Sequence, residues 1–199
     1  MYARTLARAL QMRLFTAIDL PSDVLLRLDR LLMALRPEGL IKWSPLDNLH
    51  ITTKFIGEWA DSRLDELDST LSAIRPRDSI HIELADLGWF PNERSPRVLW
   101  IGVHGGTALL DLVHETEERL AAIGIKREER EFAGHMTLAR IKSPVPLGGL
   151  RQKVQEMQPA ALGHFLVSHF SLFRSDPGSN ASIYRKLREY KFASALAAS

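Results

Sequence analysis

One order of elements occurs twice in the sequence, and this repetition is the feature that most constrains the fold. A strand-like segment at 13–19 is followed by a helical pattern and then by a strand that carries His50. A strand-like segment at 97–103 is likewise followed by a helical pattern and a strand that carries His135. Two similarly built lobes would bring two equivalent strands to one interface. The sequence therefore predicts one compact domain made of two lobes.

Hydrophobic periodicity predicts the individual elements. Apolar residues at helical spacing predict helices that begin at Ser22, Leu64 and Thr107, and a short fourth helix near 150–157. Period-two alternation predicts strands at 13–19, 49–56, 79–87, 97–103, 133–141, 164–174 and 182–192. The stretch PNERSPR, 91–97, is expected to form a hairpin loop between two of these strands.

The composition is that of an ordinary globular protein, with 199 residues of which 45% are hydrophobic and 25% charged. Because cysteine is absent, a disulfide framework, a thiolate zinc site and a cysteine nucleophile are excluded. The formal net charge of +2 permits a polyanionic ligand without demanding one. No apolar run approaches the roughly 18 residues of a membrane span, so we expect no membrane association. A cytoplasmic location is the expectation.

The first residues do not resemble a signal peptide, because MYARTLARALQ has no continuous apolar segment. Strand-like alternation begins directly after Met12. We expect residues 1–11 to be a dispensable tail, residues 12–193 to form the domain, and residues 194–199 to be a C-terminal tail. Failure of a variant that begins at Met12 to fold would contradict this expectation.

The strand that contains HITTKF carries polar residues at positions where a buried strand would carry valine. Residues two apart in a strand point to the same face. Alternation therefore predicts one face with His50, Thr52 and Lys54. The opposite, core-facing side would carry Ile51, Thr53 and Phe55.

A second strand, HMTLAR, repeats the spacing with His135 and Thr137, followed by Ala139. Met136 and Leu138 would be buried behind it. A phosphate between the two strands would meet two hydroxyl groups and two imidazoles. Because the unperturbed imidazole pKa is about 6.5, one histidine can act as a base while the other acts as an acid near neutral pH. Such a pair is sufficient for in-line displacement at phosphorus without a metal ion.

The two motifs and their flanks resemble a known enzyme family. HITTKF and HMTLAR are similar to the paired HxTx motifs of the 2H phosphoesterases. The flanks LFTAIDLP, KWSPLDNLHITTKFIGE, PRVLWIGV and EREFAGHMTLAR, with FSLFRSDPGSNASIY near the C-terminus, resemble the bacterial and archaeal RNA 2′,3′-cyclic phosphodiesterases, also called 2′-5′ RNA ligases. The resemblance extends from Met12 to about Phe192.

The resemblance implies an α+β fold of two pseudo-symmetric lobes, with antiparallel sheets that line a central cleft and helices on the outside. It implies hydrolysis of RNA 2′,3′-cyclic phosphate ends to 2′-phosphates without a metal or other cofactor. His50 would be the proton donor to the departing 3′ oxygen, and His135 would activate water. Thr52 and Thr137 would hold the phosphate oxygens.

Arg140 occupies the position of the family's arginine, yet strict alternation from His135 places it on the opposite face. It would reach a phosphate only if the strand bulges or ends first, and otherwise it would cover the lobe surface or touch the RNA backbone. Lys54 lies four residues after His50, so alternation places it on the same face as the histidine, where it could contact a substrate. It is equally well interpreted as a simple surface lysine. Phe15 would stack on a base or belong to the core, and Trp43 and Tyr184 are open to the same two interpretations.

Gly134 departs from the family pattern, which usually has proline before the second histidine. We expect this glycine to loosen the approach to the strand without removing a catalytic group. The remaining histidines lack a threonine two residues later and are interpreted as surface or packing residues: His81, His104, His114, His164 and His169.

Several functions remain open at this stage. A metal hydrolase would need three or more ligands in frame, which the HxT strands do not supply. A non-catalytic RNA-binding module would leave the matched histidines unexplained. A 2′-5′ RNA ligase, a nuclease for 2′-5′ oligoadenylates or a phosphodiesterase for another cyclic phosphate would use the same four residues. We expect a monomer that acts on RNA ends or small cyclic nucleotides.

Overall fold

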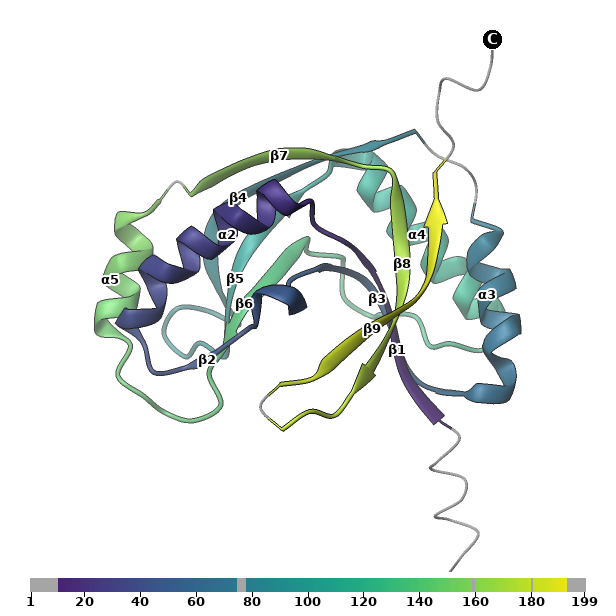
Figure 1. The fold of residues 1–199 in the computed structure, drawn as a ribbon, viewed down its shortest axis with the longest axis horizontal. Coiled ribbons are helices and arrows are strands. Elements are labelled where there is room, and N and C mark those ends of the chain that lie inside the picture. The colour runs from purple at the N-terminus through teal and green to yellow at the C-terminus, as the bar shows by residue number, and fades with distance from the viewer. Residues whose placement is uncertain (1–10, 75–77, 159, 180, 193–199) are drawn as a thin grey trace, which may run out of the picture.

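The computed structural model describes residues 11–74, 78–158, 160–179 and 181–192, and the structural statements below concern these residues. Two antiparallel sheets form the framework (Figure 1). The first sheet has the order β3-β1-β8-β9 and is built from β1 (Gln11–Ile18), β3 (Ile51–Ala60), β8 (His169–Asp176) and β9 (Ile183–Lys191). The second has the order β2-β6-β5-β4-β7 and is built from β2 (Lys42–Trp43), β4 (Ile80–Phe90), β5 (Val98–His104), β6 (His135–Arg140) and β7 (Ala161–Val167).

Four α-helices lie outside the two sheets (Figure 1): α2 (Ser22–Leu35), α3 (Leu64–Ser72), α4 (Gly106–Ala122) and α5 (Gly148–Glu156). The segment of α2 forms an amphipathic helix because Val24, Leu28 and Leu32 recur on one face, and this face is buried. It ends before Pro37, whose ring cannot continue the helix. Short 3-10 turns follow at η1 (Arg36–Glu38), η2 (Leu46–Asn48) and η3 (Asp61–Arg63).

The helices are exchanged between the two sheets. Although α2 lies between β1 and β3 of the first sheet in the chain, it packs against β7 of the second sheet and against α5. Conversely, α4 connects β5 and β6 of the second sheet but packs against β3 of the first sheet and against α3, as well as against β4. Figure 1 shows α2 and α5 on one side of the molecule and α3 and α4 on the other. Each sheet is therefore packed against a helix that follows a strand of the other sheet.

This architecture confirms the predicted α+β fold, with two similarly built lobes and peripheral helices. The four predicted helices are present, and the loop at 91–97 joins the antiparallel strands β4 and β5 as expected. The prediction of one continuous strand at 164–174 is wrong. The segment divides at Ser168 into β7 and β8, which belong to different sheets. The Ser168 carbonyl instead accepts a hydrogen bond of 2.8 Å from the amide of Phe192.

The chain start agrees with a strand that begins near Met12. Gln11 is the first residue of β1 and lies opposite Ala60, and Met12 is buried in the core. Gln11, the last residue of the predicted tail at 1–11, is therefore already part of the sheet. The rest of that tail and the C-terminal tail at 194–199 lie outside the described residues, so the dispensability of residues 1–10 stays a prediction. Within the described part of the chain, no helix has both the length and the apolar composition that crossing a membrane requires.

Candidate active site

The two strands that carry the HxT motifs lie side by side although they belong to different sheets. Strands β3 and β6 contact each other across the boundary between the lobes. The segment before β3 strengthens this junction, because β2 pairs with β6 and the Ser44 hydroxyl donates a hydrogen bond of 2.9 Å to the Thr137 carbonyl. The fold thus brings together the two motifs that the sequence separates. We call the surface formed by His50, Thr52, His135 and Thr137 the histidine face.

Both imidazoles are held by the same local hydrogen bond. The Nδ1 atom of His50 lies 2.7 Å from the carbonyl oxygen of Asn48, and that of His135 lies 2.8 Å from the carbonyl oxygen of Ala133. Because a carbonyl only accepts, each Nδ1 carries the hydrogen and each Nε2 remains for proton transfer. Both rings are half-buried. Two oriented imidazoles with matching reactive nitrogens are therefore presented from neighbouring strands.

A β-bulge directly follows the threonine in each motif. In β3, Thr52 lies opposite Ala17 and Lys54 lies opposite Thr16, so Thr53 is the extra residue. Its buried hydroxyl is satisfied by a bond of 2.8 Å to the Thr16 hydroxyl. A bulge of this kind shifts the alternation of the strand by one residue and re-aims the side chains after it.

The bulge in β6 has the same position in its motif. Thr137 lies opposite Trp100 and Ala139 lies opposite Leu99, so Leu138 is the extra residue. Ala139 is completely buried, whereas Arg140 is exposed. The guanidinium of Arg140 acts on His50 by charge repulsion, which lowers the pKa of that imidazole. The bulge thus satisfies the condition under which Arg140 can reach a phosphate, and the charge of the arginine is felt at His50 of the other strand.

The same shift reverses the expected faces of Lys54 and Phe55. The prediction that Phe55 faces the core is wrong, because its side chain is 64% exposed and its ring lies 6.2 Å from that of Phe15, which lies beneath His50. Lys54 is only 6% exposed and points away from the histidine face. Its ammonium group lies 2.7 Å from the Glu117 carboxylate of α4 and 2.8 Å from the Lys126 carbonyl. Lys54 therefore joins the first sheet to α4 and is not available to a substrate.

His50 lies among aromatic rings. Its ring centroid is 4.9 Å from that of Phe15 and 5.1 Å from that of Tyr184, and Phe173 stacks behind Phe15 at 5.3 Å. Phe15 is only 3% exposed, so it supports the imidazole and leaves almost no surface for a base. Trp43 is half-buried in β2, and its indole N–H donates to the Gly39 carbonyl at 3.1 Å.

Burial lowers the pKa of His50 below its ordinary value of 6.5, because desolvation disfavours the charged ring. The hydrogen bond to the Asn48 carbonyl and the negative charge of Asp19 oppose this effect, while the positive charge of Arg140 adds to it. The protonation of His50 in the free protein is thus set by a balance between a desolvating aromatic pocket and the nearby carboxylate of Asp19.

His135 has different neighbours. The edge of its ring meets Phe90 at a centroid distance of 4.9 Å, and Phe90 in turn packs on Trp100 at 5.1 Å. Gly134 does not loosen this segment, because its carbonyl accepts a hydrogen bond of 3.0 Å from the Val103 amide. A Cβ atom at this position would lie 2.3 Å from the Val103 carbonyl oxygen. A side chain such as proline would therefore require the adjoining strand to move.

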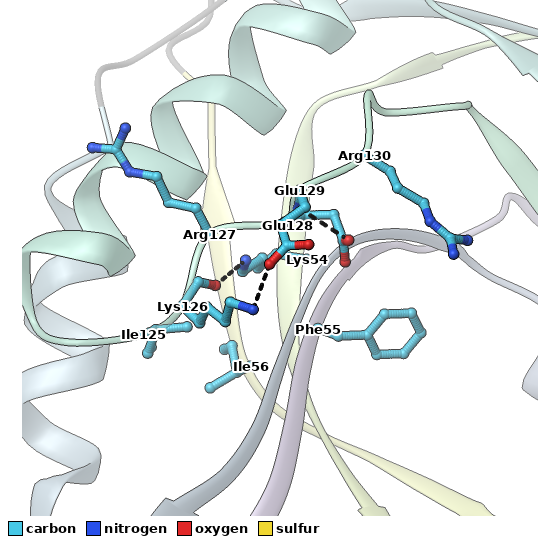
Figure 2. Close-up of a pocket in the computed structure, with 9 residues that line it drawn as sticks. All are labelled: Lys54, Phe55, Ile56, Ile125, Lys126, Arg127, Glu128, Glu129 and Arg130. Atoms are coloured by element: carbon cyan, nitrogen blue, oxygen red, sulfur yellow. Dashed lines mark hydrogen bonds and ion pairs between the residues drawn. The ribbon is translucent and has the colours of Figure 1, made fainter.

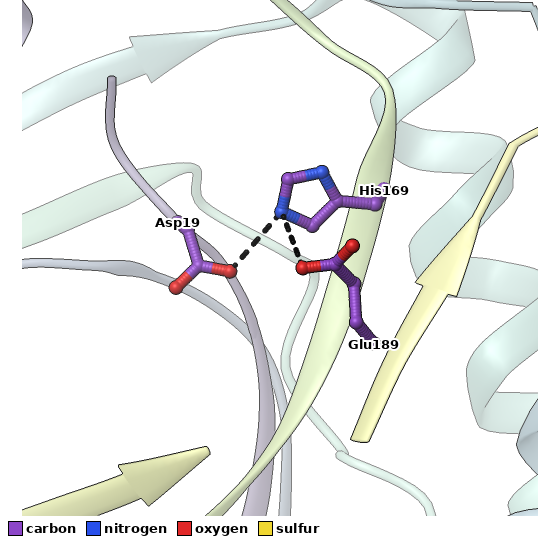
Figure 3. Close-up of side chains that lie close together, drawn as sticks. All are labelled: Asp19, His169 and Glu189. Carbon is purple, nitrogen blue, oxygen red and sulfur yellow. Dashed lines mark hydrogen bonds and ion pairs between the residues drawn. The ribbon is translucent and has the colours of Figure 1, made fainter. Parts of the chain in front are cut away.

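A charged network surrounds Asp19 at the end of β1. His169 Nε2 lies 3.3 Å from Asp19 and 3.5 Å from Glu189, as Figure 3 shows. The Lys186 ammonium lies 2.9 Å from Asp19 and 3.3 Å from Glu189. Burial raises the pKa of Asp19, but hydrogen bonds from Lys186 and Ser171, with the positive charge nearby, outweigh it and leave the pKa lowered.

Asp19, His169 and Glu189 each offer a ligand atom of the kind that binds metal ions, and these atoms lie within 4.8 Å of one another. Lys186 already supplies a positive charge to both carboxylates, which removes the main electrostatic attraction for a cation. His169 was interpreted as a surface or packing residue, and the structure instead assigns it to this network. Its ordered position between two carboxylates could not be read from its neighbours in sequence.

Comparison with known proteins agrees with this arrangement. The family model described as LigT-like phosphoesterase matches the chain twice, at residues 18–100 and 102–184. The RNA 2′,3′-cyclic phosphodiesterase of Methanocaldococcus jannaschii is 33% identical over 179 residues, which cover 90% of this chain and 100% of that protein.

Two solved structures have the same fold. The crystal structure of TT0787 of Thermus thermophilus superposes with a TM-score of 0.77 at 28% identity, covering 91% of this chain and 98% of the other. Escherichia coli LigT complexed with 3′-AMP gives a TM-score of 0.74 at 25% identity, covering 92% and 98%. Because the family model matches both halves of the chain, and the paired HxT strands and the fold agree with it, the chain belongs to the LigT-like phosphoesterases of the 2H superfamily.

Proposed function

We propose that this protein hydrolyses RNA 2′,3′-cyclic phosphate ends to 2′-phosphomonoesters by acid–base catalysis with His50 and His135. The observation that carries the proposal is the matched pair of imidazoles, each fixed through Nδ1 and each with Nε2 left for the substrate. The curated relative from Methanocaldococcus jannaschii, which bears the name RNA 2′,3′-cyclic phosphodiesterase, supports the choice of substrate.

The reaction requires one proton to be removed and one to be supplied. Nε2 of His135 takes a proton from the attacking water as its oxygen bonds to phosphorus. The bond from phosphorus to the 3′ oxygen breaks on the opposite side, and Nε2 of His50 gives its proton to that oxygen. The products are a 3′ hydroxyl and a 2′-phosphate, and the two histidines have exchanged protonation states. General acid and general base catalysis each contribute roughly 10² to 10⁴ in rate.

In this proposal three side chains hold the charged phosphate oxygens. Thr52 and Thr137 offer hydroxyl donors from the two strands, and each lies two residues from its histidine. Arg140 adds a guanidinium, which can bind two phosphate oxygens at once. The bulge after Thr137 supports this role, because it returns Arg140 to the histidine face. These donors would stabilise the charge that develops on phosphorus in the transition state.

Phe55 is the best-placed group for the terminal base. It occupies the position in β3 that Arg140 occupies in β6, two residues after the extra residue of the equivalent bulge. An exposed aromatic ring offers a stacking surface to any base and so gives little sequence preference. Phe55 was not predicted as a site residue, because strict alternation assigns it to the core. The signal that could have found it is its equivalence to Arg140 in the two motifs.

The lowered pKa of His50 bears on its role as the acid. Fewer molecules carry the proton on His50 at neutral pH, but a more acidic imidazole gives its proton to the departing oxygen more readily. The negative charge of a bound cyclic phosphate would favour the protonated ring and raise its pKa. We therefore keep His50 as the proton donor and His135 as the acceptor.

Product analysis tests the proposal. Incubation with an RNA that ends in a 2′,3′-cyclic phosphate should give only the 2′-phosphate, because the 3′ oxygen is the leaving group. A 3′-phosphate product would contradict the assigned geometry. Joining of a 5′-hydroxyl RNA under the same conditions would favour the 2′-5′ ligase. RNA binding with no turnover would favour the RNA-binding module.

A chelator experiment tests the choice between histidines and a metal ion. If the two imidazoles supply both proton transfers, then activity should be unchanged after dialysis against a chelator and on addition of magnesium. Loss of activity in the chelator, with recovery on addition of one particular metal, would instead support the metal hydrolase. In that case Asp19, His169 and Glu189 would be the first ligands to replace.

A further inference from the structure

A pocket of about 400 Å³ lies at the edge strand β3, where its lining begins two residues after Thr52 of the histidine face. One wall is formed by Lys54, Phe55 and Ile56 of β3, and the other by the loop 125–130 between α4 and β6 (Figure 2). The same loop leads into the strand of His135. A substrate whose terminal base stacks on Phe55 would therefore have this pocket and its loop directly beside it.

The cations of this pocket differ in whether a partner already holds them. Lys54 is bound to Glu117 at 2.7 Å, Lys126 to Glu129 at 2.6 Å, and Arg127 to Glu118 at 2.7 Å. Among the residues that the structure describes, no hydrogen bond or ion pair is found for the guanidinium of Arg130. Figure 2 shows the Arg130 side chain extending to the same side of the pocket as the exposed ring of Phe55.

The carboxylates of the pocket do not cancel this charge. Glu129 is paired with Lys126, and the Glu128 carboxylate accepts a hydrogen bond of 3.2 Å from the amide of Glu129. Both carboxylates therefore bind groups of the loop 125–130 itself. Arg130 is left as an exposed guanidinium that can bind a phosphate through two parallel hydrogen bonds.

We propose that Arg130 binds the backbone phosphate on the 5′ side of the terminal nucleotide, and so makes the protein prefer an RNA chain to a cyclic mononucleotide. This inference rests on the proposed function, since it assumes that the terminal cyclic phosphate occupies the histidine face. A mononucleotide has no internal phosphodiester and cannot use this contact. An oligonucleotide gains it without any change at the reacting phosphorus.

A pair of substrates tests the assignment. We would measure kcat/KM for adenosine 2′,3′-cyclic phosphate and for a short oligoadenylate that ends in the same cyclic phosphate. Arg130→Gln should lower the value for the oligonucleotide roughly fivefold, as expected for one exposed ion pair, and leave the value for the mononucleotide unchanged. Lys153→Gln on α5 removes the same charge from an exposed site on the other side of the molecule and should change neither value.

Salt dependence provides a second readout. Each phosphate contact on a single strand contributes about 0.7 to the slope of log affinity against log salt. Arg130→Gln should reduce the slope for the oligonucleotide by about that amount, while Arg130→Lys, which keeps the charge, should retain most of it. A purely structural effect of the substitution would lower kcat/KM for both substrates and would not change the slope selectively.

The outcomes separate this inference from the proposed function. If Arg130→Gln loses kcat/KM equally on both substrates, or on neither, then the proposed role of Arg130 is wrong. Hydrolysis of the substrates by the unmodified protein would still support the proposed function. If the unmodified protein hydrolyses neither substrate, then the proposed function fails. Binding of the fluorescently labelled oligonucleotide, which requires no turnover, would still decide whether Arg130→Gln weakens the phosphate contact.

Discussion

Strands β3 and β6 have the same backbone design but different chemical surroundings. Each carries a histidine held through Nδ1, a threonine two residues later and a bulge immediately after it. After the bulge, β3 presents the exposed ring of Phe55, whereas β6 presents the guanidinium of Arg140. His50 is enclosed by aromatic rings that lower its pKa, while His135 meets Phe90 by its edge.

This contrast teaches how two similar halves can perform different tasks. The backbone supplies the equivalent positions, and a single side chain at each position then decides what it contacts. In our proposal, β3 serves the base and the leaving oxygen, and β6 serves the phosphate and the attacking water. The following experiments ask whether the two strands differ in this way or act as interchangeable copies.

Replacing either histidine should have the largest effect. His50→Ala and His135→Ala should each reduce turnover by about 10² to 10⁴ without unfolding the protein, because each removes one proton transfer. Turnover of the cyclic phosphate RNA and the circular dichroism spectrum are the measurements. His114→Ala, on the exposed face of α4, is the matched control and should retain full activity.

A substrate whose leaving group needs no proton then distinguishes the two strands. It should restore much of the rate of His50→Ala but not that of His135→Ala. The opposite pattern would exchange the donor and acceptor roles. Rescue of neither variant would mean that paired acid–base catalysis by these histidines is the wrong account.

Replacing the threonines should have a smaller and nearly equal effect in the two strands. Thr52→Val and Thr137→Val each remove one hydroxyl that binds a charged oxygen, at a cost of at most about 1.5 to 3 kcal/mol in transition-state stabilisation. Steady-state kcat/KM measures this loss. A threonine variant that is more damaged than both histidine variants would show that the proposed roles are assigned wrongly.

Removing the ring of Phe55 should weaken the use of the base but not the chemistry. Stacking of one base on an aromatic side chain contributes about 1 to 3 kcal/mol, and we expect the lower end for a ring that is 64% exposed. Phe55→Ala should therefore lower kcat/KM roughly fivefold for a nucleotide substrate. Leu166→Ala, another exposed apolar residue, is the control. An equal loss with a cyclic phosphate that lacks a base would contradict stacking.

The smallest expected effect is a shift in pH dependence. The rate should follow a bell-shaped pH profile with limbs set by the histidine pair. In the free protein, the NMR titration of His50 should have its midpoint below pH 6.5, because burial lowers its pKa. Asp19→Asn removes a negative charge that favours the protonated ring, so the midpoint should move to still lower pH.

A matched surface substitution controls for the change in net charge. Asp23→Asn on α2 removes a carboxylate that pairs with Arg27, and it should leave the His50 midpoint in place. A midpoint that rises in Asp19→Asn would contradict the sign of the interaction. The corresponding limb of the kcat/KM profile should move in the same direction as the midpoint.

The sequence predicts the repeated order of elements and the two histidine motifs, because periodicity and motif spacing are local properties of the chain. It does not predict the bulges after Thr52 and Thr137, since alternation assumes a regular pleat. For this reason the expected faces of Lys54 and Phe55 were wrong, and the placement of Arg140 was open. The break at Ser168 was missed because neither glycine nor proline marks it, and the two segments differ only in their strand partners.

The exchange of α2 and α4 between the sheets has a consequence for how the molecule loses its structure. Because each sheet packs against a helix that follows a strand of the other sheet, and the buried residues form a single apolar cluster, neither sheet has a complete core of its own. We expect one calorimetric transition rather than two, with equal van't Hoff and calorimetric enthalpies. Slowly exchanging amides of β1 and β5 should then lose protection together. A substitution that destabilises one helix should therefore lower the stability of both strands that carry the histidine motifs.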